Sequence, residues 1–354
     1  MLNGLRRRGL HRWLPGYLAS APGRALRRRR ARHPIHVLVL VCDHFEPRHG
    51  ARDDDHVRDR LLTWEREYPR FRERCRAAFG HAPRHTWFYP PHHGLENLAR
   101  LGRWTFEGHG EVELHYHHGN DDSGSLRRGL GDALLAFHRH GMLLGQGSPP
   151  SPSFAFIHGD WALDNSGPRE HCGVNDELSI LQELGCWGDF TMPSANACQT
   201  RQTNSIYYAI DDPGRPRSHD TGPPARAGRR PPEGLFLMQG PLGINWRAPR
   251  YPRIENASLT TANWGRRDRV RQWLSCHVHV RGRPDWVFVK LHTHGAIDRD
   301  HDALFGERAF KLHRTLNEEW NDGARYRLHY VTAREAFNVA RAAELGKDGD
   351  PAGH

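Results

Sequence analysis

The amino-acid sequence predicts an α/β fold in which parallel strands alternate with helices, and three observations support it. Residues 35–42 form a short apolar run rich in β-branched side chains, which is typical of a strand buried on both faces of a parallel sheet. Apolar residues then recur every three or four positions over residues 53–78, which predicts a long amphipathic helix. The same alternation of strand-like and helix-like segments repeats along the rest of the chain.

The remaining elements are assigned by the same two periodicities. We expect further strands at 84–89, 111–117, 154–158, 187–191, 235–239, 286–292 and 326–331. We expect further helices at 93–102, 125–144, 175–184, 264–280, 300–320 and 332–344. So many strand–helix units favour a closed or nearly closed barrel, with a doubly wound open sheet as the alternative fold.

Two terminal segments and one internal segment differ in composition from the predicted barrel. Residues 1–32 are rich in Arg and contain no Asp or Glu, so we expect a basic N-terminal arm that is either solvated or in peripheral contact with a membrane or nucleic acid. Residues 33–345 are expected to form a single catalytic domain, with a loop insertion at about 211–234 where Pro, Gly and Arg recur. Residues 346–354 are expected to be a disordered tail.

The distribution of charged and apolar residues limits the kinds of binding partner and the cellular compartment that we expect. The formal net charge is +10, but much of the excess lies in residues 1–32, so the rest of the chain is close to balanced. We therefore expect no nucleic acid as the main partner. The N-terminal segment has no uninterrupted apolar core, which argues against a secretory signal or a membrane span. We expect a cytoplasmic protein, with peripheral contact at the inner face of the membrane through residues 1–32 as an alternative.

The six cysteines contain no Cys-x-x-Cys pair. We therefore expect them to be reduced and mostly structural, and to form neither a disulfide framework nor a thiolate zinc site.

Metal-ligand residue types occur at three predicted strand ends. These are Asp43-His44-Phe45-Glu46, Glu113-Leu114-His115-Tyr116-His117-His118 and His292-Thr293-His294. In a parallel barrel the working residues lie where strands end and loops begin. Imidazole and carboxylate are good zinc ligands, and three protein ligands with one open position is the catalytic arrangement. The sequence therefore predicts one divalent metal ion, with Zn²⁺ as the expected metal.

These motifs resemble those of the polysaccharide deacetylase family, also called the NodB homology domain. The resemblance spans roughly residues 35–300 and also includes Leu-Gly-Cys-Trp-Gly-Asp-Phe at 184–190 and Lys-Leu-His-Thr-His at 290–294. It implies a deformed (β/α)7-type barrel, similar to a TIM barrel. It also implies a metal-dependent hydrolase of carbohydrate metabolism, such as exopolysaccharide biosynthesis, that acts on carbon–nitrogen bonds other than peptide bonds.

For the metal, the resemblance implies a set of ligands with two alternatives. His44 stands where the family has a metal-binding carboxylate, and Glu46 is the alternative ligand. His115 matches the first metal-binding histidine. The second is His118 or His117, and His118 is preferred because it lies just past the strand, where the chain can turn back.

For catalysis, the resemblance implies three further roles. Asp43 takes the position of the base that removes a proton from the attacking water. His292 takes that of the general acid that protonates the leaving group, with His294 as its competitor. Asp189 takes that of the carboxylate that orients the catalytic histidine.

The predicted substrate groove differs from the family pattern. Where the family carries an Arg after the fourth strand, this chain has Ile157-His158-Gly159-Asp160-Trp161. We expect Trp161 to stack on a sugar, with Trp187 as a second candidate and packing in the core as the alternative for both. Asp160, Asn120 and His294 are further expected substrate contacts.

The expected substrate is an acetylated sugar, oligosaccharide or glycan precursor, and loss of an N-acetyl group is favoured over loss of an O-acetyl group. Two other functions remain open. One is a barrel that binds glycan without turning it over. The other is a two-metal phosphoesterase, since Gly119-Asn120-Asp121 and Gly159-Asp160 resemble fragments of such enzymes.

Overall fold

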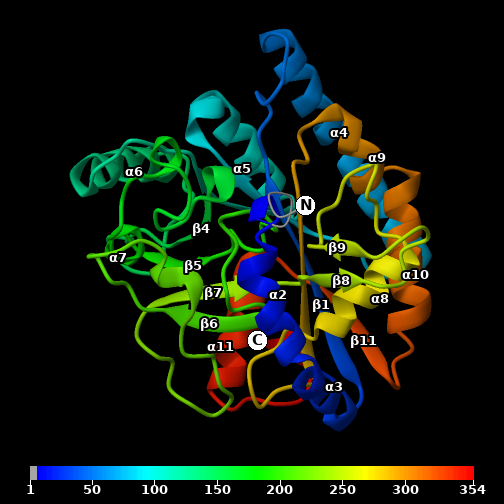
Figure 1. Ribbon diagram of the computed structural model, residues 1–354. Coiled ribbons are helices and arrows are strands. Elements are labelled where there is room, and N and C mark those ends of the chain that lie inside the picture. The colour runs from blue at the N-terminus through cyan, green and yellow to red at the C-terminus, as the bar shows by residue number, and fades with distance from the viewer. Residues whose placement is uncertain (1–5) are drawn as a thin grey trace.

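The structure, a computed structural model, describes residues 6–354 (Figure 1). Nine strands form one sheet in the order β10-β1-β2-β3-β4-β5-β7-β6, and β11 pairs with the first half of β1. Strands β8 and β9 form a separate antiparallel pair. The strands are β1 (Ile35–His44), β2 (His85–Tyr89), β3 (Gly110–Tyr116), β4 (Phe154–His158), β5 (Cys186–Asp189), β6 (Ser205–Ala209), β7 (Leu235–Gln239), β8 (Gly243–Asn245), β9 (Arg253–Glu255), β10 (Trp286–Thr293) and β11 (Tyr326–Tyr330).

Helices follow most of the strands, and most of them cover the outer face of the sheet. They are α2 (Leu10–Ala19), α3 (Ala21–Arg30), α4 (Asp54–Phe79), α5 (Leu98–Phe106), α6 (Ser123–His138), α7 (Glu177–Glu183), α8 (Arg267–Cys276), α9 (His301–Leu304), α10 (Glu307–Trp320) and α11 (Ala333–Glu344). Local sequence sets several of their ends. The Asp53 carboxylate accepts from the His56 N–H at the start of α4, and Gly80, with φ 80°, ends that helix.

The α/β architecture with a mostly parallel sheet is confirmed, but the closed barrel is not. Strands β10 and β6 are the two edges of the main sheet and do not pair with each other. Strand β6 also runs antiparallel to β7. Two extended segments lie between the edges and make only isolated bridges, Val278 with Phe288 and Arg226 with Arg281. Among the described residues the sheet therefore remains open.

The two faces of the sheet carry separate apolar clusters. On β1, Leu38, Leu40 and Cys42 belong to an inner cluster that also holds residues of β4, β6, β7 and α11. Val39 and Val41 alternate with them and pack outward against α4 and its neighbours. Because strand residues alternate between faces, each position on β1 is assigned to the enclosed side or to the helix side. All ten residues of β1 are buried, as a strand covered on both faces requires.

Both ends of the chain pack against the body. Trp13 and Tyr17 of α2 are buried with Leu242, and Arg12 forms an ion pair with Asp220. The described part of the basic arm is thus helical and docked, although residues 1–5 lie outside the described residues. At the other end, Pro351 is buried and Trp286 Nε1 donates to the Gly349 carbonyl oxygen at 3.1 Å, so these two residues of the expected tail contact the body.

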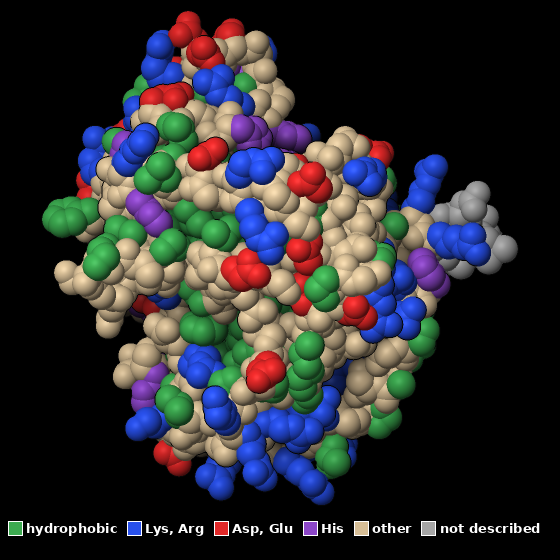
Figure 2. Space-filling model, turned by 90° about the vertical axis from the view of Figure 1, so that its left-hand side faces the viewer, with side chains coloured by type: hydrophobic (Ala, Val, Ile, Leu, Met, Phe, Trp, Pro, Cys, Tyr) green, Lys and Arg blue, Asp and Glu red, His purple; other side chains and the backbone are tan. Residues whose placement is uncertain are grey.

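The described helices include none that combines the length and the apolar character needed to cross a bilayer. Figure 2 shows acidic and basic side chains mixed over one face of the molecule, with Lys and Arg gathered along its lower edge.

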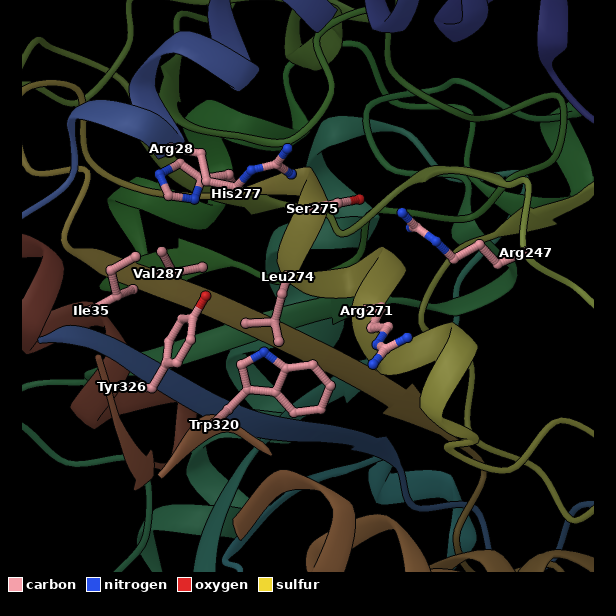
Figure 3. A pocket seen from close by; sticks show the side chains of 10 residues that line it. All are labelled: Arg28, Ile35, Arg247, Arg271, Leu274, Ser275, His277, Val287, Trp320 and Tyr326. Atoms are coloured by element: carbon pink, nitrogen blue, oxygen red, sulfur yellow. The ribbon is translucent and has the colours of Figure 1, made fainter. Parts of the chain in front are cut away.

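A cavity of about 310 Å³ lies at the end of the sheet where β1 and β10 begin (Figure 3). Ile35, Val287 and Trp320 line it together with arginines such as Arg28 and Arg271. Since His44 and His292 lie at the opposite, carboxyl ends of these strands, this cavity is separate from the predicted site.

Candidate metal centre

Three predicted ligand residues meet at the carboxyl ends of β1 and β3. His44, Glu46 and His115 each offer one ligand atom, and these atoms lie within 4.8 Å of one another. All three residues are buried. His44 ends β1 and continues the inward row of Leu40 and Cys42, while His115 points inward from β3. The sequence left open whether His44 or Glu46 is the metal ligand, and the structure places both residues in this group.

Hydrogen bonding orients the ligand nitrogens of this group. His115 Nδ1 lies 2.9 Å from the Ile157 carbonyl oxygen, so the Nδ1–H donates to it and the lone pair of Nε2 faces the group. The Nε2 atom of His44 is buried and has no hydrogen-bond partner among the described residues. An unpaired buried nitrogen is costly, and a bound cation would satisfy it.

Two more histidines complete a rim around Glu46. His117 Nε2 lies 3.0 Å from Glu46 Oε1 and 3.1 Å from His115 Nε2. His294 Nε2 lies 3.5 Å from Glu46 Oε2. The side chains of His117 and His294 are both partly exposed. The group is thus buried on the protein side and open to solvent on one side.

The charge arrangement favours an ionised carboxylate. Burial disfavours the charge on Glu46, but its contacts with His115 and His117 outweigh burial and hold its pKa well below its usual range. Burial likewise disfavours the charged form of His117, but hydrogen bonds to Asp160 and Glu46 raise its pKa to about 9. The site therefore presents a carboxylate surrounded by imidazoles, which is a good donor set for zinc.

His118 does not join this group. Residues 115 and 117 lie on one face and 118 on the other, because side chains of an extended chain alternate. His118 Nε2 instead lies 3.4 Å from Glu177 Oε1, and its Nδ1 lies 3.1 Å from Asp121 Oδ2. Of the two alternatives for the second histidine, His117 is the one next to Glu46 and His115.

Asp43 lies on the opposite face of β1 from His44. Its Oδ1 accepts from the Gly295 N–H at 2.6 Å, its Oδ2 lies 3.7 Å from His85 Nε2, and the residue is fully buried. Burial raises the pKa of Asp43 to about 8. These contacts position the loop after β10 and give no support to a role as the base at the metal centre.

Asp189 also makes local contacts. Its carboxylate accepts from the Thr191 N–H at 3.1 Å and from the Thr191 hydroxyl at 2.6 Å. Burial raises the pKa of Asp189 to about 6. No hydrogen bond or ion pair joins it to His292 within residues 6–354, so the expected orienting contact is not made in this structure.

His292 and Trp161 form a wall beside the ligand group. The Trp161 ring centroid lies 4.7 Å from that of His44 and 5.2 Å from that of His292. His292 is buried, and its Nδ1 has no hydrogen-bond partner among the described residues. Trp161 is partly exposed and has φ 63°, a left-handed backbone conformation that is rare for a bulky residue.

The other expected substrate contacts differ in position. Asp160 Oδ2 lies 3.2 Å from His117 Nδ1, at the rim of the group. Asn120 is exposed, and its backbone N–H donates to the Arg169 carbonyl oxygen. Trp187 contacts Phe337 with ring centroids 4.7 Å apart and tilted planes, and it packs against the inner core, which favours packing over sugar binding for this residue.

A second group of ligand-type side chains lies beside the first: His118, His158, Cys172 and Glu177. Sequence reasoning did not bring these four residues together. His158 and Glu177 lie in predicted elements or at their edges, but Cys172 sits in a loop at a spacing that matches no known zinc motif. The one signal in the sequence is the density of His, Cys and Glu between residues 158 and 177.

The chain matches no known family model and no curated protein. One similar solved structure is that of a "putative polysaccharide deacetylase from Mycobacterium smegmatis". It is 13% identical, with a TM-score of 0.47, and the match covers 90% of this chain and 94% of that chain. Similarity at this level carries no argument about function, which must come from the residues themselves.

Proposed function

We propose that the chain is a metal-dependent hydrolase that removes acetyl groups from a carbohydrate. The observation that carries the proposal is the convergence of His44 and Glu46, at the end of β1, with His115 of β3, whose ligand atoms lie within 4.8 Å of one another. Their N and O donors suit Zn²⁺, and the solvent-facing side leaves room for a fourth ligand. The resemblance of the sequence motifs to polysaccharide deacetylases supports acetyl transfer to water as the reaction.

The ion and the chain supply different parts of the chemistry. A divalent ion bound here supplies a Lewis acid that polarises a carbonyl and makes water a better nucleophile at neutral pH. Glu46 and the two imidazoles hold that ion, and the Ile157 carbonyl fixes the orientation of His115. Asp160 holds His117 at the rim through a hydrogen bond.

Two histidines flank the place where protons move. His294 is partly exposed and lies beside Glu46, so it can accept a proton from the attacking water and return it to the departing amine or hydroxyl. His292 lies against Trp161 with an unpaired Nδ1, and burial holds its pKa well below its usual range, so its neutral imidazole can orient the departing group by a hydrogen bond. In this proposal, His294 replaces Asp43 as the base.

Trp161 supports a sugar as the substrate. An indole ring offers an apolar face to the C–H groups of a pyranose while excluding water from the reacting carbonyl. An acetylated sugar or oligosaccharide, with N-acetyl preferred, is the substrate class that we propose.

The test is acetate release by the purified full-length protein from a panel of N-acetylated and O-acetylated sugars, oligosaccharides and sugar nucleotides. Treatment with a chelator should abolish release, and added Zn²⁺ should restore it. The variant His115→Ala should be inactive in every condition. Zinc-loaded protein that binds the sugars but releases no acetate would contradict the proposal and favour a glycan-binding role. Phosphate release from phosphoesters would favour the phosphoesterase alternative.

A further inference from the structure

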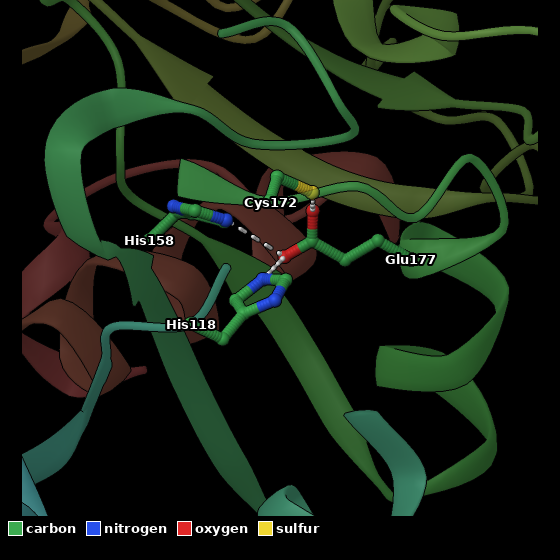
Figure 4. A group of neighbouring side chains, drawn as sticks. All are labelled: His118, His158, Cys172 and Glu177. Carbon is green, nitrogen blue, oxygen red and sulfur yellow. Dashed lines mark hydrogen bonds and ion pairs between the residues drawn. The ribbon is translucent and has the colours of Figure 1, made fainter. Parts of the chain in front are cut away.

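The group beside the candidate metal centre has the composition of a closed metal site. His118 follows β3, His158 ends β4, Cys172 lies in the loop after β4, and Glu177 begins α7. Figure 4 shows the two imidazoles and the thiol directed at the Glu177 carboxylate from different sides. One ligand atom from each of the four lies within 4.8 Å of the others. Two His, one Cys and one Glu are all established ligand types for zinc.

The two distances between imidazole nitrogens and the Glu177 carboxylate suit a tetrahedral ion better than they suit hydrogen bonds. Bonds of roughly 2.0–2.3 Å at tetrahedral angles place neighbouring ligand atoms about 3.3–3.6 Å apart. Glu177 Oε1 lies 3.4 Å from His118 Nε2 and 3.5 Å from His158 Nε2. Glu177 Oε2 lies 3.5 Å from Cys172 Sγ. Hydrogen bonds between N and O atoms are normally 2.7–3.2 Å long, as a rough range, so these nitrogen contacts are long.

The outer nitrogen of each imidazole has its own acceptor. His118 Nδ1 lies 3.1 Å from the Asp121 carboxylate, and His158 Nδ1 contacts the Gly159 carbonyl oxygen. These acceptors place the proton on Nδ1 and leave the Nε2 lone pair directed into the group, as the outer partners of metal-bound histidines do. The Nε2 atom of His158 is buried with no hydrogen-bond partner among the described residues.

The sulfur of Cys172 has two backbone N–H donors beside it, and without a metal its thiol faces two acceptors, the Val174 carbonyl oxygen and the Glu177 carboxylate. The Asn165 N–H and the Val174 N–H lie 3.3 Å and 3.5 Å from Sγ. Burial and the Glu177 carboxylate raise the pKa of the Cys172 thiol, whereas these N–H contacts lower it, so the thiolate that binds metal would form together with the ion. The same Glu177 Oε2 that lies near Cys172 accepts from the Asp164 N–H at 2.6 Å, which fixes the carboxylate and leaves Oε1 directed at the two imidazoles.

We propose that His118, His158, Cys172 and Glu177 bind a second zinc-type divalent ion in a structural site. Four protein ligands complete a tetrahedral shell, so no position is left for substrate. The near-zero exposure of the group agrees with a closed site. This inference does not rest on the proposed function, because none of its four ligands belongs to the open centre and a thiolate–cobalt band reports the cysteine ligand alone.

The ion would hold a loop that has little regular structure. Between β4 and α7, Asp164 and Asn165 have left-handed backbone conformations, with φ 53° and 52°. The same loop carries Asp160 and Trp161, which face the open centre. Joining β3, β4 and α7 through one ion would fix this loop and so hold the wall of the open centre in place.

The alternative for the same atoms is a metal-free network in which a doubly protonated His118 pairs with Glu177. A cobalt experiment on the full-length protein separates the two. Chelator-treated protein is reloaded with Co²⁺, and its near-ultraviolet spectrum is recorded. A thiolate–cobalt charge-transfer band is expected, with about two ions bound per chain. Absence of the band in folded wild-type protein would overturn the proposal.

Variants assign the band to this site. Cys172→Ser should abolish it and remove one ion per chain, whereas Cys186→Ser, a matched control at a buried cysteine of β5, should retain both. His115→Ala should keep the band, because it changes only the open centre. A band that survives Cys172→Ser would overturn the assignment. If Cys172→Ser fails to fold, the spectrum of the His115→Ala protein still decides, since loss of the band there would place the thiolate ion at the open centre and contradict the proposal.

Discussion

The two groups of metal-ligand side chains are neighbours that meet at the end of β3, yet they differ in access to solvent. The open centre uses the inward-facing His115, and its rim residues His117 and His294 have side chains 30% and 34% exposed. The closed group uses His118 and His158, whose side chains are 2% and 0% exposed. In the two proposals, similar ligand types form a catalytic metal site in the open centre and a structural metal site in the closed group. The exposure of the side chains to solvent distinguishes the two.

The largest effect is expected from a change at the open centre. Glu46→Gln should lower kcat/KM for acetate release at least about a thousandfold, because metal assistance contributes several kcal/mol to the barrier and each 1.36 kcal/mol is tenfold. Steady-state kinetics and metal content check this together. His140→Ala, at an exposed histidine just after α6, is the control and should be unchanged. Full activity in Glu46→Gln would contradict the assignment of the catalytic metal to the open centre.

A change at the closed group should affect stability more than chemistry. A bound ion present at about a thousand times its dissociation constant stabilises the fold by about 4 kcal/mol. In the His115→Ala background, a chelator should therefore lower the free energy of unfolding by up to about that amount. The double variant His115→Ala/Cys172→Ser should not respond to the chelator. Denaturant titration with and without the chelator measures the difference, and equal responses in the two proteins would contradict the comparison.

A smaller effect is expected from a change at Trp161, which lies beside the open centre in the loop that the closed group would hold. Trp161→Ala should raise KM for a sugar substrate about tenfold with a smaller change in kcat, because an aromatic contact contributes roughly 0.5–1.5 kcal/mol beyond its buried area. Trp246→Ala changes an exposed tryptophan and should leave both constants unchanged. A fall in kcat alone would assign Trp161 to the chemistry and not to binding.

The smallest effect concerns a buried histidine outside both groups. His313 lies against Phe71, with its Nδ1 2.8 Å from the Tyr330 hydroxyl oxygen, and burial lowers its pKa to about 3. A lowered histidine pKa gives stability that is present above the unfolded pKa near 6.5 and is lost as pH falls towards 3. Wild type should therefore lose about 1.2 kcal/mol through this residue between neutral pH and pH ~5.5.

The variant His313→Gln should show a correspondingly flatter pH dependence of the free energy of unfolding over that range. Denaturant titrations at a series of pH values measure it. An identical slope in the two proteins would mean that His313 is not held neutral by burial.

Much of the fold could be predicted from local patterns. The strands expected at 154–158 and 235–239 coincide with β4 and β7, because short apolar runs flanked by Gly, Pro and Ser mark buried strands. Strand β6 was missed, since Ser205–Ala209 follows a polar segment rich in Asn, Gln and Thr and pairs antiparallel at an edge. The docking of α2 was also missed, because its Trp13 and Tyr17 find their partners far along the chain.

The sequence by itself determined that strands alternate with helices and that imidazoles and carboxylates gather where strands end. Only the tertiary structure decided which of them meet. Strand periodicity places His117 and His118 on opposite faces of the sheet. It does not say which of these faces lies inside the curved sheet, or which distant residues a loop approaches. Glu46 and Cys172 reach their groups through irregular backbone, whose path depends on distant contacts. Ligand chemistry is a property of residue type, whereas a binding site is a property of distances between residues far apart in the chain.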